Sequence, residues 1–119
     1  MTKPVVFIVE DDPKLNNIAH LTLESDFDVE NFTDGNAVIQ RLDRFTPQLV
    51  ILDLNLPGSS GRDILNKIRR NQQFANTRVI LTTADERQAE TLTEDADIIL
   101  LKPVSPGQLR ELAIRMTST

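Results

Sequence analysis

The chain has 119 residues, of which 39% are apolar and 26% charged, and a formal charge of −5. This length fits one domain with a buried core, and a negative charge without a basic stripe argues against direct nucleic-acid binding. There is no cysteine and a single histidine, His20, which excludes disulfides and argues against a zinc or iron site built from Cys and His.

Four unbroken apolar runs rich in β-branched residues predict strands buried on both faces of a parallel sheet. They are Val5–Val9, Leu49–Leu52, Val79–Leu81 and Ile98–Leu101. A weaker run, Phe27–Phe32, alternates and predicts an edge strand. The first run is too short for a membrane span or a signal peptide and ends in three acids, so we expect a cytoplasmic protein without a membrane contact.

Apolar residues at helical spacing fill the gaps between these runs. The stripes are Leu15, Ile18, Ala19 and Leu23; Val38, Leu42 and Phe45; Ile64, Leu65 and Ile68; and Leu109, Leu112, Ala113 and Met116. Residues 86–94 offer only Ala89 and Leu92 as anchors, which predicts the least secure helix. Five strand–helix units predict an α/β fold with an open, doubly wound parallel sheet, because an eight-fold barrel needs about 200 residues or more.

The residues that follow the strands carry the chemistry, because ligands bind at the carboxyl ends of strands in open parallel sheets. Crowded carboxylates repel one another unless a cation or protons neutralise them, and an all-oxygen set selects Mg²⁺ or Mn²⁺. A carboxylate in the centre of the sheet can also act as a nucleophile and form an aspartyl phosphate. The set is Glu10, Asp11 and Asp12 after the first strand, Asp53 after the third, Thr82 and Thr83 after the fourth, and Lys102 after the fifth.

Four short motifs at these strand ends resemble the receiver domain of two-component response regulators. They are "VEDDP", "DLNLPGSSG", "TAD" and "LKP", and the resemblance extends from about Val5 to Met116. It implies a single receiver domain over residues 1–119 with the family's five-stranded sheet in the order 2-1-3-4-5, an order taken from the family.

The resemblance also implies residue roles. Asp53 would accept a phosphoryl group from a histidine kinase or a histidine phosphotransfer protein, in a Mg²⁺-dependent reaction. Lys102 would bridge the phosphoryl oxygen and the acids, and Thr83 would be the hydroxyl that reports phosphorylation. The remaining implied features are Asp11 and the Asn55 carbonyl as metal ligands, Glu10 acting beside them through water, a cis bond before Pro103, and a loop shaped by Gly58 and Gly61.

One departure from the family concerns how the signal leaves the site. Where the family usually carries Tyr or Phe three residues before the lysine, this chain has Ile99, which we expect to be permanently buried. As a substitute we expect a shift of the loop formed by Thr83, Ala84 and Asp85, together with the weak fourth helix. Thr82 competes with Thr83 for the switch role, but the alanine that follows Thr83 favours Thr83.

Alternatives to a phosphorylated signalling domain remain open at this point. Asp12 is explained by helix capping alone. A phosphatase of the haloacid-dehalogenase kind would need an acid where Asn55 stands, so we expect a protein that catalyses only its own phosphorylation and dephosphorylation. A receiver-shaped interaction module without phosphorylation is the other alternative. The output would be a separate effector protein or an additional C-terminal domain, and homodimerisation through the fourth and fifth helices is left open.

Overall fold

The computed structural model describes residues 2–92 and 95–118. At its centre lies a five-stranded parallel sheet in the order β2-β1-β3-β4-β5. The predicted α/β class, the strand order and the edge position of the second strand are therefore confirmed. The strands are β1 (Val5–Val9), β2 (Asp28–Phe32), β3 (Leu49–Asp53), β4 (Arg78–Thr83) and β5 (Ile98–Leu101).

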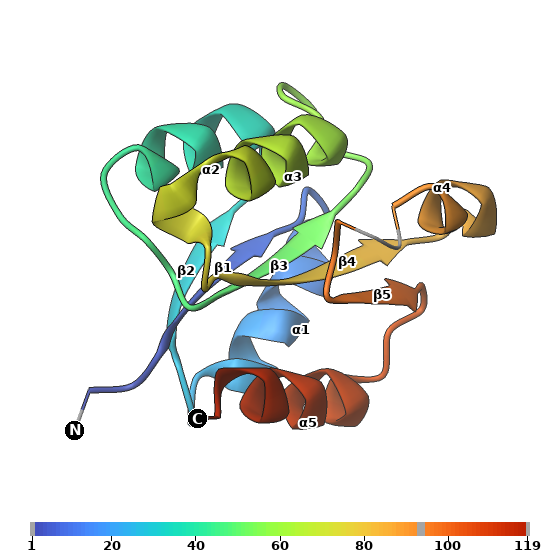
Figure 1. Ribbon diagram of the computed structural model, residues 1–119. Coiled ribbons are helices and arrows are strands. Elements are labelled where there is room, and N and C mark those ends of the chain that lie inside the picture. The colour runs from blue at the N-terminus through green and yellow to red at the C-terminus, as the bar shows by residue number, and fades with distance from the viewer. Residues whose placement is uncertain (1, 93–94, 119) are drawn as a thin grey trace.

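Helices cover both faces of this sheet (Figure 1). One face carries α2 (Gly35–Leu42), α3 (Gly61–Arg70) and a 3₁₀ turn at Gln72–Phe74, and the opposite face carries α1 (Pro13–Leu23) and α5 (Pro106–Thr117). The short helix α4 (Glu86–Glu90) follows the end of β4. β3 lies between the two layers and has all five residues buried, as expected for a strand covered on both faces.

Each of the five α-helices in the described part of the chain begins at a side chain that accepts a hydrogen bond from a backbone N–H of the first turn. Such caps satisfy amide groups that would otherwise lack a partner. Most of them follow a strand by a few residues, so the caps help to place the helix starts at the carboxyl edge of the sheet. The capping residues are Asp12, Asp34, Ser60, Asp85 and Ser105.

The apolar face predicted for the first helix is only partly correct. Leu23 is fully buried, but Leu15 and Ile18 are 42% and 47% exposed. The N-terminal half of α1 borders an open groove between α1 and α5, so these two side chains have no layer above them. A polar residue, Asn16, is buried instead.

The fourth helix is shorter than the expected segment 86–94. α4 ends at Glu90 and has no buried residue, whereas Leu92 beyond it is buried; residues 93–94 lie outside the described part. Ile99 was expected to be permanently buried, and this is wrong. It is half-buried against the core, because β5 is an edge strand. No helix among the described residues is both long and apolar enough to cross a membrane.

Candidate functional site

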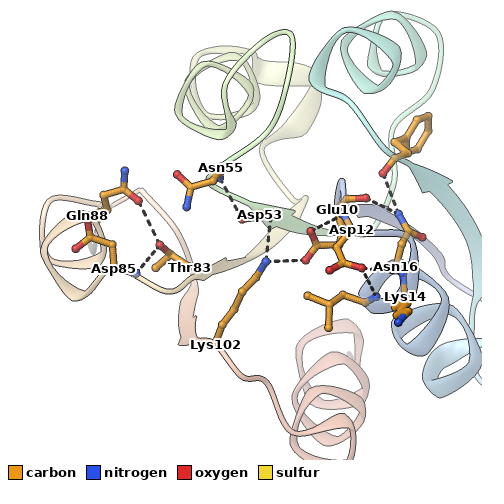
Figure 2. Close-up of polar contacts among 12 residues, drawn as sticks. Glu10, Asp12, Lys14, Asn16, Asp53, Asn55, Thr83, Asp85, Gln88 and Lys102 are labelled. Atoms are coloured by element: carbon orange, nitrogen blue, oxygen red, sulfur yellow. Dashed lines mark hydrogen bonds and ion pairs between the residues drawn. The ribbon is translucent and has the colours of Figure 1, made fainter.

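The carboxyl edge of the sheet brings Asp53, Glu10 and Lys102 into direct contact (Figure 2). Asp53 ends β3 and is 2% exposed. The Lys102 Nζ lies 3.0 Å from Asp53 Oδ2 and 2.8 Å from Glu10 Oε1. The other oxygen of Asp53 accepts a hydrogen bond from the Asn55 N–H at 3.1 Å. The side chains at the ends of β1, β3 and β5, predicted to meet, form one ion-paired cluster.

Asp11 completes an acidic cluster with Glu10 and Asp53. One carboxylate oxygen from each of the three residues lies within 4.8 Å of the others. Asp11 is exposed, whereas the other two acids are buried, so the cluster opens to solvent on the Asp11 side. Three carboxylates face one lysine, and this excess of oxygen donors and negative charge suits a hard divalent cation. The acidic cluster could therefore hold a metal ion.

The electrostatics of the cluster shift the pKa values of two of its side chains, Glu10 and Lys102. Burial raises the pKa of Glu10 from 4.5 to about 7, and the neighbouring Asp53 adds to the rise, although the hydrogen bond from Lys102 opposes it. For Lys102, burial would lower the pKa, but its contacts with Glu10 and Asp53 outweigh burial and raise it above 10.5. The lysine therefore stays charged, and near neutral pH Glu10 is only partly ionised, so a bound cation would favour its ionised form.

The loop after Asp53 depends on two glycines that the resemblance singled out. Gly58 has a φ of +76°, which only glycine adopts freely. A Cβ on Gly61 would lie 2.5 Å from the Asp53 carbonyl oxygen and 2.6 Å from the Leu54 Cα. Gly61 therefore allows α3 to start directly against the end of β3.

The two threonines of β4 point to opposite sides, as neighbouring strand residues do. Thr82 lines the groove beside Lys102. The Thr83 hydroxyl accepts a hydrogen bond from the Asp85 N–H at 3.1 Å and donates one to Gln88 Oε1 at 3.3 Å. Figure 2 shows this hydroxyl turned toward α4 and away from Asp53. The backbone carbonyl of Thr83 accepts a hydrogen bond from the Lys102 N–H.

The remaining predicted residues lie around this cluster. Ala84 and Asp85 are exposed, and the Asp85 carboxylate caps α4 by accepting from the Arg87 N–H. The peptide bond between Lys102 and Pro103 is cis, as the resemblance implied. Asp12 caps α1, as its plain structural interpretation predicted.

The buried Asn16 is a further residue next to the site that was not predicted. Its Nδ2 donates to the carbonyls of Glu10 and Phe32 at 2.9 and 3.0 Å, and its Oδ1 accepts from Asn31. It therefore ties the end of β1, next to the acidic cluster, to the end of β2. An asparagine inside a predicted apolar stripe was the available signal.

Comparison with known proteins gives the family. The model of the response regulator receiver domain matches residues 6–114, and the chain belongs to this family. The transcriptional regulatory protein TrcR of Mycobacterium tuberculosis is 33% identical over 93% of this chain and 43% of its own length. The sensor histidine kinase TmoS of Ectopseudomonas mendocina is 32% identical over 91% of this chain and 11% of its own length. The chain thus spans less than half of either relative.

The fold is shared with solved receiver domains. The BeF3-activated receiver domain of DrrB from Thermotoga maritima is 26% identical, with a TM-score of 0.86 over 97% of both chains. The chain is therefore a response regulator receiver domain in sequence and in fold, a module of signal transduction.

Proposed function

We propose that the chain is a phosphoacceptor that takes a phosphoryl group from a phosphohistidine donor onto Asp53 and thereby changes its binding to a partner. The observation that carries this proposal is the buried Asp53 carboxylate, paired with Lys102 and adjoining Glu10 and Asp11. A buried carboxylate nucleophile, with a lysine ammonium group and further carboxylate oxygens beside it, is suited to phosphoryl transfer.

In the proposed reaction an oxygen of Asp53 bonds to phosphorus while the P–N bond of phosphohistidine breaks; its electron pair returns to the ring, which takes up one proton from solvent and leaves as neutral imidazole. The ammonium group of Lys102 donates a hydrogen bond to a phosphoryl oxygen, and its raised pKa keeps it charged. Glu10, Asp11, Asp53 and the carbonyl of Asn55 would hold Mg²⁺ or Mn²⁺. A bound cation of this kind would offset the negative charge of the incoming phosphoryl group. Hydrolysis of the acylphosphate then regenerates Asp53.

The donor is proposed to dock beside the acidic cluster. A groove of about 340 Å³ between α1 and α5 reaches Glu10 and Lys102 and is mainly apolar. The exposed Leu15 and Ile18 form one wall. An apolar helix of a histidine kinase or phosphotransfer protein laid here would cover these side chains and bring its phosphohistidine to Asp53. We propose that residues 1–119 form a single receiver domain and that it works in the cytoplasm.

The direct test is intact mass after incubation with Mg²⁺ and acetyl phosphate. We expect one added phosphoryl group in the wild type, none without a divalent cation, and none in Asp53→Asn. Asp63→Asn, at an exposed aspartate of α3, is the matched control and should still be phosphorylated. An adduct of equal yield in Asp53→Asn would refute the assignment. No adduct in the wild type, with Mg²⁺ shown to bind, would favour an interaction module that works without phosphorylation.

A further inference from the structure

The Thr83 hydroxyl can donate one hydrogen bond, and the side chain of Gln88 accepts it. The Thr83 oxygen already accepts from the Asp85 N–H at 3.1 Å, and its own proton points to Gln88 Oε1 at 3.3 Å (Figure 2). Thr83 is 0% exposed and Gln88 is half-buried. Since a hydroxyl donates only once, Thr83 cannot keep the bond to Gln88 and donate to a phosphoryl oxygen on Asp53 as well.

Gln88 belongs to α4, a short helix that has no buried side chain to fix its position. α4 has five residues and none is buried. At its C-terminal end, the Thr91 hydroxyl donates to the Gln88 carbonyl and accepts from Arg62 of α3 at 3.1 Å. A short helix without an apolar anchor of its own takes much of its position from such polar contacts. Loss of the Thr83 bond would therefore loosen α4.

The side chain that usually couples to the switch hydroxyl is replaced here. Ile99 packs against the core and has no polar group, so it cannot form a hydrogen bond with Thr83. Gln88 is the side chain that does so.

We propose that Gln88 is a positioning residue that holds the Thr83 hydroxyl away from Asp53, and that phosphorylation transfers this hydrogen bond to the phosphoryl oxygen and releases α4 for partner binding. The proposal rests on the proposed phosphorylation of Asp53. The proton stays on the Thr83 oxygen throughout, and the freed side-chain oxygen of Gln88 accepts a hydrogen bond from water instead.

The test uses BeF3 as the phosphoryl mimic, titrated in the presence of Mg²⁺ and followed by NMR. Gln88→Met keeps the length of the side chain and removes its acceptor, so activation no longer breaks a hydrogen bond. A neutral hydrogen bond of ordinary net strength corresponds to about 2- to 10-fold tighter BeF3 binding in this variant. Gln88→Glu keeps an acceptor oxygen and should show no such gain. Gln40→Met, at an exposed glutamine of α2, is the control for the substitution itself.

A double-mutant cycle separates this coupling from a general effect on the helix. In a Thr83→Val background, Gln88→Met should leave BeF3 affinity unchanged, because the bond is already absent. Amide hydrogen exchange in α4 should rise on BeF3 binding in the wild type and should already be raised in unbound Gln88→Met.

Three outcomes decide the matter. If wild-type Asp53 takes the phosphoryl group, two results overturn the role of Gln88 but leave the proposed function standing. These are unchanged BeF3 affinity in Gln88→Met, or a gain in affinity that persists with Thr83→Val. Failure of the wild type to form any adduct at Asp53 overturns the proposed function, and this inference with it. Tighter binding that depends on Thr83, with exchange in α4 as described, supports the inference.

Discussion

The raised pKa of Glu10 predicts how stability depends on pH when no divalent cation is present. Burial is the main cause of the rise from 4.5 to about 7. Between these values the folded protein binds more protons than the unfolded chain, so the free energy of unfolding falls as the pH increases. The stabilisation associated with Glu10 is fully present below pH 4.5 and is lost once the pH passes about 7.

The size of this effect follows from the same two values. At about 1.4 kcal/mol for each pH unit between them, the window corresponds to about 3.5 kcal/mol at most. Solvent at the rim of the sheet screens part of this, so we expect about 1 to 2 kcal/mol. Glu10→Gln cannot titrate and should lack this part of the pH dependence. The difference between the two proteins isolates Glu10 from the other acids.

The assay is urea unfolding in EDTA at intervals from pH 4.5 to 8, for the wild type, Glu10→Gln and Glu90→Gln. Glu90 is an exposed residue of α4 and serves as the matched control, whose curve should run parallel to the wild type. The wild type should lose stability relative to Glu10→Gln as the pH rises to about 7, with no further divergence above it. Parallel curves for the wild type and Glu10→Gln across this range would refute the reasoning.

Three further changes test the packing and charge of the site. Gly61→Ala should destabilise by about 1 to 3 kcal/mol through overpacking, because its Cβ would meet the Asp53 carbonyl oxygen at 2.5 Å; Gly107→Ala, whose Cβ has no neighbour closer than 4.0 Å, should be neutral or stabilising in the same urea titration. Asn16→Ala should cost about 1 to 3 kcal/mol by removing the side-chain donor to the Glu10 and Phe32 carbonyls, which chemical denaturation measures; an effect under 0.5 kcal/mol would contradict this. Lys102→Met leaves the acidic cluster uncompensated, so its melting temperature should rise more than that of the wild type on adding Mg²⁺, and an equal rise would count against the lysine as the neutralising group.

Much of the fold can be predicted from local sequence patterns. Unbroken β-branched runs indicate strands buried on both faces, and turn residues with capping side chains indicate where helices begin. Because parallel strands share one carboxyl edge, the order of elements along the chain was enough to predict that Asp53, Glu10 and Lys102 would meet. The structure agrees, with the Lys102 ammonium group in contact with both carboxylates.

Tertiary structure alone decided what lies around that cluster. The stripe of α1 could not reveal that Leu15 and Ile18 border an open groove, because exposure depends on how far α5 lies from α1. The position of Asn16 beside the apolar stripe hinted that it is buried, but its role depends on the tertiary structure, because two of its partners are backbone carbonyls at the ends of two strands. Helical spacing also gave no indication that Gln88 accepts a hydrogen bond from the Thr83 hydroxyl. Short-range pattern determines the elements and the edge at which chemistry gathers, whereas hydrogen bonds between distant segments depend on the packing of the whole chain.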